Sequence, residues 1–332
     1  MRERRMVEII LPGLALKTPA IAFGCSSLTG TDRDNANRVL ETAFDAGVRH
    51  FDTARYYGYG EAEGILGRFL KGRRSEVTIS TKFGIEPPKR TTALGVGLYV
   101  GRRIVRLMPS ARTLLQRGTQ SLVKSGAFSA QQAQESLETS LHELRTDHLD
   151  FYLLHDYVVR DELPDELLEF LENSVKAGKI RSFGLGTSID NIELALKRQP
   201  RLCRVLQFQN SVLSRNADYL PRDHSDPLRI THGALGGSYR SILAFLSART
   251  DVAKDWSAKL GCRLLDQEIL SALMLNYAAD ANPHGLVLFS SRHPIRVTRN
   301  VKAVLESDFS PAQIAMFAEL VNQELPLIVA SV

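Results

Sequence analysis

Four side chains with complementary chemistry end or follow apolar runs of the sequence: Asp52, Tyr57, Lys82 and His155. A phenol has a pKa of about 10, so it is a poor proton donor at neutral pH unless a neighbouring ammonium lowers that pKa. A buried lysine in turn needs a counter-charge, which an aspartate supplies. A histidine opposite the phenol can donate a hydrogen bond to a carbonyl oxygen and orient it. Together these residue types predict a proton donor for a carbonyl group that is being reduced.

Each of the four residues also has an ordinary structural interpretation. Asp52 could cap the turn that follows it, and Tyr57, one of three tyrosines in that turn, could be a packing residue. Lys82 could be solvated, and His155 could be a histidine satisfied within the core. The chemical hypothesis therefore depends on elements that bring the four side chains to one place.

The apolar runs predict eight short strands, each nearly continuous in apolar character, as expected where helices cover a parallel sheet. These strands are expected at residues 20–23, 48–52, 77–82, 149–155, 181–186, 204–209, 228–232 and 286–290. Amphipathic stretches fit between most of them. One helix is expected to begin at Ser129, with Gln132 completing a capping box, and another at Ser310, which is followed by Pro311 and Gln313.

This alternation of strands and helices predicts a (β/α)8 TIM barrel with an N-terminal β-hairpin and long loops over its C-terminal face. A doubly wound sheet would also alternate, but "FGCSSLTG" at 23–30 lacks the G-x-G-x-x-G pattern that usually marks its first turn. In a barrel the carboxyl ends of all strands meet at one face. The four side chains would therefore share a site at that face.

The chain is expected to form a single domain over residues 1–332, with the hairpin at residues 1–18. Residues 84–128 are interpreted as a long insert after the third strand. Residues 211–227 are polar where a sixth helix should stand, so only a short helix is expected there.

The net charge of +5 comes from the insert 84–128, which holds eight basic residues and a single acidic one, Glu86. Because the excess is local, we expect no binding to nucleic acid. The insert could be a solvated flap. It could also be a lid or a docking surface for an anionic partner, such as a carrier-bound or phosphorylated substrate or an anionic membrane surface.

The three cysteines are far apart and odd in number, which excludes a disulfide framework or a zinc pattern, and no metal is expected. No apolar run approaches the roughly 18 residues of a membrane span, so no transmembrane segment is expected. A cytoplasmic protein is predicted. In the absence of a coiled-coil pattern, it is expected to be a monomer or a weak oligomer.

The segment "FDTARYYGYGEAEGILG" at 51–67 closely resembles the first signature of the aldo-keto reductase family, with its aspartate and tyrosine five residues apart. "TISTK" at 78–82 and "LDFYLLHD" at 149–156 resemble the strands that carry that family's lysine and histidine. The resemblance extends from about residue 18 to about residue 305. It implies that Asp52, Tyr57, Lys82 and His155 are the catalytic residues.

The resemblance also implies an NADP(H) site without a Rossmann motif. "GLGTS" at 184–188 resembles the segment that holds the nicotinamide carboxamide, so Ser188 is expected to contact the cofactor, although Ile189 replaces the usual asparagine. Gln207 is expected to share that task. His232 takes the place of the aromatic residue that stacks under the nicotinamide.

"SSRHPIRVTRN" at 290–300 resembles the last signature of the family, which binds the adenosine 2′-phosphate and the adenine. It implies that Ser291, Arg296 and Asn300 bind the cofactor, while Ser290 replaces a common lysine or glycine. An arginine near a helix N-terminus suits a phosphate. NADP(H) is therefore favoured over NAD(H).

The function expected from these features is that of an NADP(H)-dependent oxidoreductase, an aldo-keto reductase or alcohol dehydrogenase. It would transfer a hydride between the nicotinamide and a small-molecule carbonyl or alcohol substrate, with Tyr57 as general acid and base. Ser26 stands where many members have a tryptophan, which predicts a wider or more polar pocket. The alternative is a regulatory or scaffold protein of this fold that binds the cofactor with little turnover, and the departures at Ile189 and His232 leave it open.

Overall fold

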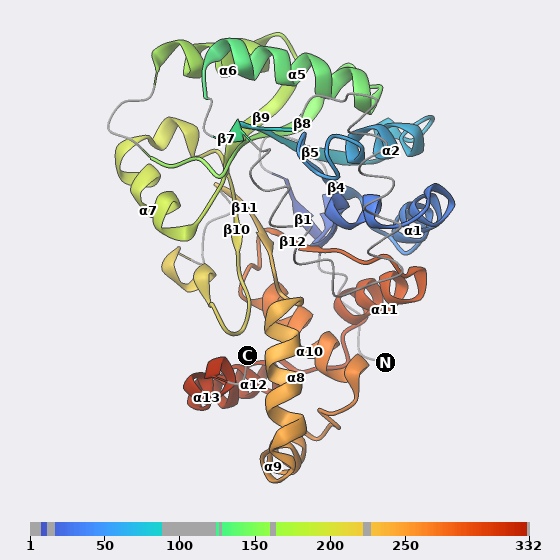
Figure 1. Cartoon of the computed structure of the whole chain (residues 1–332). Helices are drawn as coiled ribbons and strands as arrows, with labels where there is room; N and C mark the ends of the chain where they lie inside the picture. The colour runs from blue at the N-terminus through green and yellow to red at the C-terminus, as the bar shows by residue number, and fades with distance from the viewer. Residues whose placement is uncertain are drawn as a thin grey trace.

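Eight parallel strands close into a barrel (Figure 1). The computed structural model describes residues 8–11, 17–87, 124–125, 128–159, 164–221 and 227–330. The strands are β3 (Ile21–Gly24), β4 (His50–Asp52), β5 (Thr78–Phe83), β8 (Leu149–His155), β9 (Ile180–Gly186), β10 (Val205–Gln209), β11 (Leu228–His232) and β12 (Leu286–Phe289). They follow one another around the barrel in chain order, and β12 pairs with β3 to close it. The eight predicted strands and the (β/α)8 TIM barrel are confirmed.

Helices cover the outside of the barrel, which explains why the strands are buried along almost their whole length. The helices that alternate with the strands are α1 (Arg33–Asp45), α2 (Ala62–Phe69), α5 (Ala130–Leu144), α6 (Asp165–Lys176), α7 (Ile189–Arg198) and α11 (Pro294–Leu305). Strand β5 is buried at every position, and β8 is buried at every position except its last. The short helix expected within 211–227 is the single 3-10 turn Asn216–Tyr219.

Polar residues fix where the helices begin. The Ser129 hydroxyl accepts a hydrogen bond of 3.2 Å from the backbone N–H of Gln132 at the start of α5. Ser310 and Gln313 form a complete capping box at the start of α12 (Pro311–Gln323). Such caps satisfy backbone N–H groups that have no partner within the helix. Both predicted helix starts are confirmed, but the capping box expected at Ser129 lacks the return bond from Gln132.

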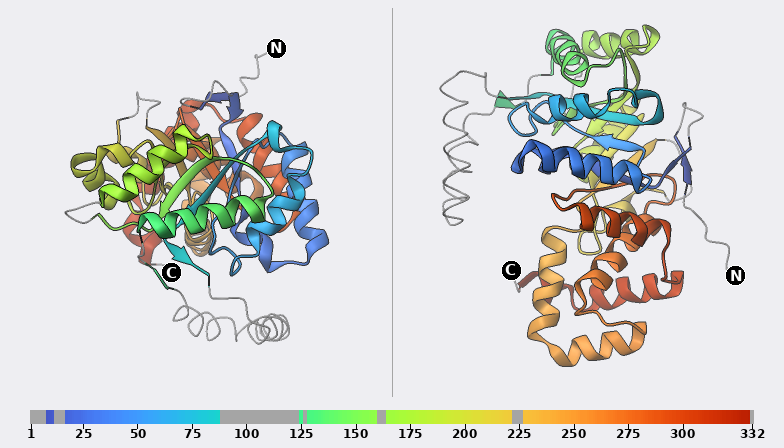
Figure 2. Two further views of the ribbon diagram at one scale, coloured as in Figure 1. Left: turned by 90° about the horizontal axis from the view of Figure 1, so that it is seen from above. Right: turned by 90° about the vertical axis from the view of Figure 1, so that its right-hand side faces the viewer.

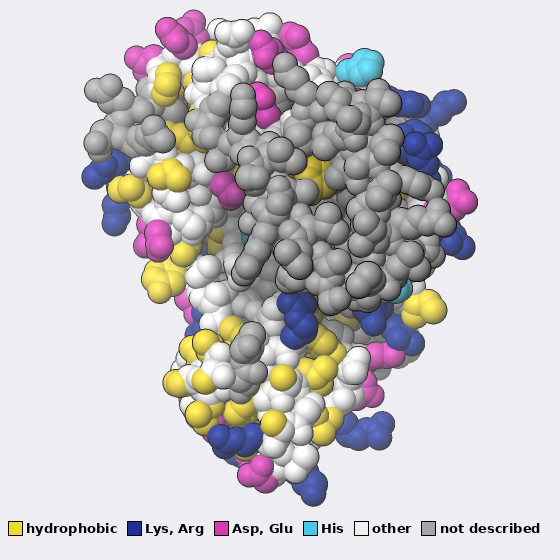
Figure 3. All heavy atoms as spheres, in the orientation of Figure 1, with side chains coloured by type: hydrophobic (Ala, Val, Ile, Leu, Met, Phe, Trp, Pro, Cys, Tyr) yellow, Lys and Arg dark blue, Asp and Glu magenta, His cyan; other side chains and the backbone are white. Residues whose placement is uncertain are grey.

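A lobe of helices that the sequence analysis did not predict stands beside the barrel. Between β11 and β12 the chain forms α8 (Gly237–Ala248), α9 (Thr250–Leu260) and α10 (Gln267–Asp280) in place of one helix. Together with α12 and α13 (Leu325–Ala330), these helices gather at one end of the molecule (Figures 1 and 2). Phe245 of α8 and Trp256 of α9 pack against each other inside the lobe. Figure 3 shows hydrophobic side chains scattered over its outer face.

Two antiparallel pairs of strands lie outside the barrel. β1 (Glu8–Ile10) pairs with β2 (Lys17–Pro19), as expected for the N-terminal hairpin, and Ile9 belongs to the same apolar cluster as residues inside the barrel. β6 (Ile85–Glu86) pairs with β7 (Lys124–Ser125), so the two ends of the insert 84–128 lie side by side. Most of the insert, including all of its arginines, lies outside the described residues. In the described part of the chain, no helix has both the length and the apolar character needed to cross a membrane.

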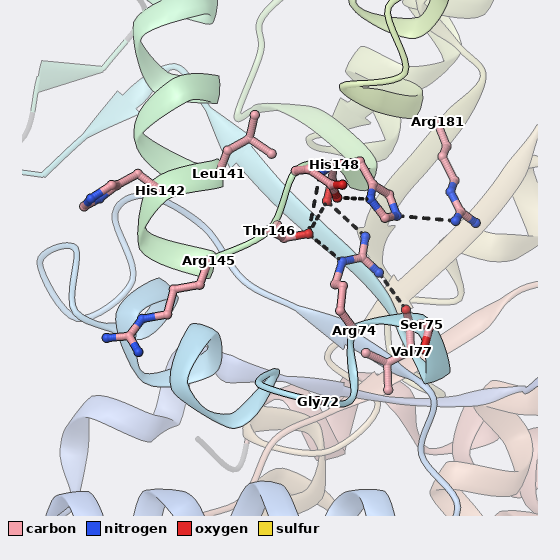
Figure 4. Close-up of a pocket in the computed structure, with 11 residues that line it drawn as sticks. Gly72, Arg74, Ser75, Val77, Leu141, His142, Arg145, Thr146, His148 and Arg181 are labelled. Carbon is pink, nitrogen blue, oxygen red and sulfur yellow. Dashed lines mark hydrogen bonds and ion pairs between the residues drawn. The ribbon is translucent and has the colours of Figure 1, made fainter.

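A polar groove lies near the N-terminal ends of β5, β8 and β9, at the opposite end of the barrel from the predicted site (Figure 4). The Arg74 guanidinium occupies its centre and is fully engaged there. It donates to Thr146 Oγ1 at 2.9 Å, to the carbonyl oxygens of Val77 and His148, and to Asp150 Oδ2 at 2.8 Å. These internal contacts give the groove a structural role.

We predict that Asp150→Asn destabilises the fold by about 3 kcal/mol, because removing one partner of a buried ion pair leaves the other uncompensated. The Asp150 side chain is fully buried and also accepts from the backbone N–H of Ile79 at 2.8 Å. Denaturant unfolding measures the loss. Asp147→Asn is the matched control, since the Asp147 side chain is 93% exposed in the same groove. Equal stability of the two variants would contradict the prediction.

Candidate active site

The four predicted catalytic residues meet in one cleft at the C-terminal ends of the strands. The cleft has a volume of about 810 Å³, and Asp52, Tyr57, Lys82 and His155 all line it. Asp52 is the last residue of β4, Lys82 lies near the end of β5, and His155 is the last residue of β8. The barrel therefore positions three of the four side chains from regular, hydrogen-bonded strands.

Lys82 and Asp52 form a buried ion pair at the base of the cleft, and each residue is only 2% exposed. Lys82 Nζ lies 2.8 Å from Asp52 Oδ1 and 2.7 Å from Asp52 Oδ2, and it also donates to the Thr53 carbonyl oxygen at 2.8 Å. Desolvation alone would lower the pKa of Lys82, but Asp52 and Tyr57 hold that pKa above its ordinary value. The lysine therefore keeps its proton, as expected from the need for a counter-charge.

Two neutral side chains complete the surroundings of the aspartate. Ser80 Oγ donates to Asp52 Oδ1 at 2.5 Å, and Gln207 Nε2 donates to the same oxygen at 2.8 Å. Desolvation would raise the pKa of Asp52, but Lys82, Ser80 and Gln207 together hold it below its ordinary value. The carboxylate is therefore ionised, and its position is fixed by side chains from two strands, the neighbouring β5 and the more distant β10.

The Tyr57 hydroxyl points at the lysine of this pair. Lys82 Nζ lies 3.4 Å from Tyr57 Oη and 4.9 Å from the centre of the ring. Burial raises the pKa of the Tyr57 phenol above its ordinary value, and the nearby Lys82 only partly opposes this. The expectation that the lysine would bring this pKa below its ordinary value is therefore wrong for the protein alone, because desolvation of the phenolate is the larger effect.

The turn after β4 holds Tyr57 in place through a left-handed stretch of backbone. Gly58 has φ = +59°, and a Cβ there would lie 2.0 Å from Thr29 Cγ2, which only glycine avoids. The next residue, Tyr59, also has a positive φ of 58°, and its ring packs edge-on against Tyr56 at 6.0 Å. Tyr56 and Tyr59 thus pack on each other, whereas Tyr57 faces Lys82.

A fully buried carboxylate, that of Glu63, ties this turn to its neighbours. It accepts hydrogen bonds from Arg55 Nη1 at 2.8 Å, from Thr81 Oγ1 at 2.6 Å and from Ser140 Oγ at 2.8 Å. The contacts reach β5 and α5, so Glu63 links three elements around the tyrosine turn.

His155 stands across the cleft from the phenol. The two rings are 6.0 Å apart and nearly perpendicular, at 85°. Burial and the charge of Lys82 lower the pKa of His155 to about 3, although Asp52 opposes the shift. The imidazole is therefore neutral at pH 7, with one nitrogen that donates a hydrogen bond and one that accepts.

Three of the residues expected to bind the cofactor line the same cleft. They are Ser188, Gln207 and His232. Ser188 Oγ accepts a hydrogen bond of 3.0 Å from Asn191 Nδ2. An asparagine therefore does lie beside this serine, although it is three residues further along the chain and not the next residue. His232 ends β11, and burial lowers the pKa of its imidazole.

The other three expected cofactor residues lie between β12 and the first turns of α11. Ser290, which lines the cleft, precedes them and donates to the Gly24 carbonyl oxygen at 2.8 Å. Ser291 Oγ accepts from the backbone N–H of His293 at 3.1 Å. Arg296 is exposed in the first turn of α11 and makes no ion pair with another described residue, while Asn300 is 9% exposed. Ser291, Arg296 and Asn300 are thus not among the residues that line the cleft, whereas the preceding Ser290 is.

The cleft contains functional candidates that the sequence analysis did not single out. They are Asp156, Gln209, Asn216, Tyr219 and the glycine-rich loop 233–236. Asp156 could have been predicted from the sequence, because it directly follows the histidine at the end of a predicted strand. Asn216 and Tyr219 lie in a polar segment, and the sequence does not predict where such a segment lies in the fold.

This fold, with these side chains at the barrel mouth, places the chain among the oxidoreductases built on a (β/α)8 barrel. More particularly, the chain belongs to the aldo/keto reductase family, whose model matches residues 20–220. The resemblance that the sequence motifs indicated is confirmed. The segment 290–300 lies beyond the matched residues.

Two curated relatives illustrate the similarity. The chain is 32% identical over 174 residues to the aldo-keto reductase yakc of Schizosaccharomyces pombe, whose name specifies NADP(+), covering 50% of this chain and 42% of the relative. It is 30% identical over 193 residues to D-threo-aldose 1-dehydrogenase of a Pseudomonas species, covering 54% and 52%. The chain thus spans about half the length of the curated relatives it matches.

Solved structures show the same fold over nearly the whole chain. The glycerol dehydrogenase of Gluconobacter oxydans superposes with a TM-score of 0.70 at 18% identity, covering 97% of each chain. An aldo-keto reductase from Klebsiella pneumoniae in complex with NADPH superposes with a TM-score of 0.63 at 20% identity, covering 95% of this chain and 94% of that one.

Proposed function

We propose that this chain is an NADP(H)-dependent oxidoreductase that interconverts a carbonyl compound and an alcohol, with Tyr57 as general acid and base. One observation carries the proposal. Lys82 Nζ contacts the buried Asp52 carboxylate at 2.7 Å and the Tyr57 hydroxyl at 3.4 Å, in a cleft large enough for a small molecule. A charged lysine held against a phenol stabilises the phenolate that remains once the proton has left.

The residues of the cleft fit a nicotinamide dinucleotide. Ser188, Gln207 and His232 stand around the mouth beside the four proposed catalytic residues. Arg296, unpaired among the described residues, lies in the first turn of a 12-residue helix, where a phosphate is favoured by the helix dipole and by charge-assisted hydrogen bonds. The name of the fission-yeast relative and the NADPH complex of the Klebsiella protein support NADP(H).

In the direction of reduction, the bound cofactor would supply a hydride to the carbonyl carbon. The Tyr57 hydroxyl gives its proton to the carbonyl oxygen, which becomes the alcohol oxygen. Lys82 stabilises the resulting phenolate, and Asp52 keeps the lysine charged. The neutral His155 donates a hydrogen bond that orients the carbonyl. Oxidation of an alcohol uses the same groups in reverse, and the names of relatives such as D-threo-aldose 1-dehydrogenase and pyridoxal 4-dehydrogenase accord with that direction.

The test begins with a fluorescence titration of NADPH, followed by assays of a panel of aldehydes, ketones and alcohols with both cofactors. Saturable NADPH binding with turnover of at least one carbonyl compound is the expected result. Binding without turnover of any member of the panel would instead support the regulatory or scaffold function. Absence of binding would overturn both.

Arg296→Ala is expected to weaken NADPH binding by about tenfold to a hundredfold while NADH binding stays unchanged, because only NADPH carries the 2′-phosphate. The control is Arg299→Ala. Arg299 stands on the same helix and pairs with Glu268, so its loss should alter neither affinity. An equal loss of both cofactors in Arg296→Ala would contradict the assignment of the phosphate.

A further inference from the structure

One carboxylate in the cleft has no part in the proposed proton transfer. Asp156 follows His155 directly, beyond the end of β8, and its backbone N–H donates to the Gly186 carbonyl oxygen at 2.7 Å. Its φ of +51° is left-handed, a conformation in which aspartate is among the residues most often found. Successive side chains of a strand point to opposite faces. Here the turn lets His155 and Asp156 line the same cleft.

The side chain of Asp156 is exposed, and unlike the carboxylates of Asp52 and Glu63 it has no partner among the described residues. Asp52 is held by Lys82, and Glu63 by Arg55. Across the described ranges, no hydrogen bond or ion pair reaches the Asp156 carboxylate. The residue lines the cleft, which also contains Lys82. Partial burial raises the pKa of the Asp156 carboxyl above its ordinary value, and the charge of Lys82 opposes this shift.

The rest of the described lining offers little to an anion. The charged side chains are the carboxylates of Asp52, Asp156 and Asp190 and the single ammonium of Lys82. That ammonium is bound to Asp52. His155 is neutral at pH 7, and the pKa of His232 is also lowered by burial. Other polar side chains that line the cleft are neutral, among them Ser26, Gln209, Asn216 and Tyr219.

We propose that Asp156 determines substrate choice, by accepting a hydrogen bond from a hydroxyl on the carbon next to the reacting carbonyl. This inference rests on the proposed function of the same site. His155 orients the carbonyl oxygen, and the Cα of the next residue is only about 3.8 Å further along the chain. In a substrate whose carbonyl oxygen lies at His155, the substituent of the adjacent carbon would thus come within reach of the Asp156 carboxylate, which lines the same cleft. The preferred substrates are neutral α-hydroxy carbonyl compounds, and a carboxylate at that carbon is repelled.

The experiment compares two aldehydes of nearly equal shape, lactaldehyde and 2-methylpropanal, which carry a hydroxyl and a methyl group at the same place. With NADPH, we expect kcat/KM for lactaldehyde to exceed that for 2-methylpropanal by about tenfold or more, as for a hydrogen bond to a charged group. In Asp156→Asn the ratio should fall several-fold, and in Asp156→Ala it should approach one. The same variants should improve kcat/KM for glyoxylate, whose carboxylate stands at that carbon.

Asp190→Asn is the matched control, because Asp190 is an exposed carboxylate of the same cleft in the first turn of α7. It should leave the ratio of the two aldehydes as in the wild type. A wild-type ratio near one, an unchanged ratio in Asp156→Ala, or an equal fall in Asp190→Asn would each overturn the proposal. If NADPH binds but neither aldehyde nor any other carbonyl compound reacts, the proposed function itself fails, and this inference fails with it.

Discussion

Tyr57→Phe should reduce turnover of every carbonyl substrate by about 10²- to 10⁴-fold, the usual contribution of a positioned general acid. The substitution removes only the hydroxyl that lies 3.4 Å from Lys82 Nζ. Lys82 keeps its contacts with Asp52 and with the Thr53 carbonyl oxygen, so the ion pair should survive. NADPH affinity and the unfolding midpoint should therefore stay close to those of the wild type, and steady-state kinetics together with an NADPH titration measure both expectations.

Tyr56→Phe is the control for this substitution, since it removes a phenol one residue away. Tyr56 packs against Tyr59 and has no contact with Lys82 among those recorded for the described residues. Its loss should change turnover far less. Near-normal turnover in Tyr57→Phe would exclude the phenol as the proton donor, and an equal loss in the two variants would point to the conformation of the turn instead.

The pH dependence follows from the directions of the pKa shifts. Burial raises the pKa of Tyr57, so the phenol is protonated across the neutral range, and the rate of carbonyl reduction should be flat there and fall only in strong alkali. Alcohol oxidation needs the phenolate and should accelerate as the pH rises. Because the pKa of His155 is lowered to about 3, the rate in neither direction should change near pH 6.5, where an ordinary histidine titrates. Profiles of kcat/KM in both directions measure this.

The barrel could be predicted from the sequence because most of its strands are short, largely buried runs rich in apolar residues. Strand β8 is an example, since its predicted and observed limits coincide at Leu149–His155. The helical lobe could not be predicted in the same way. Helix α10 has a buried residue on nearly every side, so it lacks the amphipathic period that marks a surface helix. It packs against α8, α11 and α12, and no local sequence pattern shows these contacts.

The residue types of the site and their order along the chain were enough to predict which side chains meet. Their contacts with one another were not predictable, because they depend on side chains brought together from distant strands. Gln207 was expected to serve the cofactor, yet its amide nitrogen donates to Asp52, 155 residues earlier. The pKa of Tyr57 likewise depends on how deeply the turn buries the phenol, and this depth cannot be predicted from the local sequence.

Asp52→Asn is the second substitution with a large expected effect, and it should reduce both stability and turnover. It leaves the 2%-exposed Lys82 without its counter-charge, and breaking a buried ion pair in this way typically costs about 3–5 kcal/mol. The pKa of Lys82 would then fall, because desolvation would no longer be opposed by the carboxylate. A lysine that loses its proton cannot stabilise the Tyr57 phenolate, so turnover should fall even under conditions where the variant is folded.

The wild-type ion pair should contribute a constant stability through the neutral range. The pKa of Asp52 is lowered in the folded state, so its contribution is complete above the unfolded value of about 3.9 and is lost as the pH falls through the folded pKa. The pKa of Lys82 is raised, so its contribution is complete below the unfolded value of about 10.4 and is lost as the pH rises through the folded pKa. Unfolding free energies measured between these limits should therefore compare the variants directly.

The double variant Asp52→Asn with Lys82→Met separates the two effects. Each single substitution leaves one buried charge alone, whereas the double one leaves none, so a double-mutant cycle should show recovery of much of the lost stability. Turnover should stay as low as in the single variants, because the proton donor still lacks its lysine. A double variant as unstable as Asp52→Asn would show that the unpaired charge is not the cause of the destabilisation. One that regained turnover would show that the ion pair has no part in proton transfer, which the contact of Lys82 with both Asp52 and Tyr57 argues against.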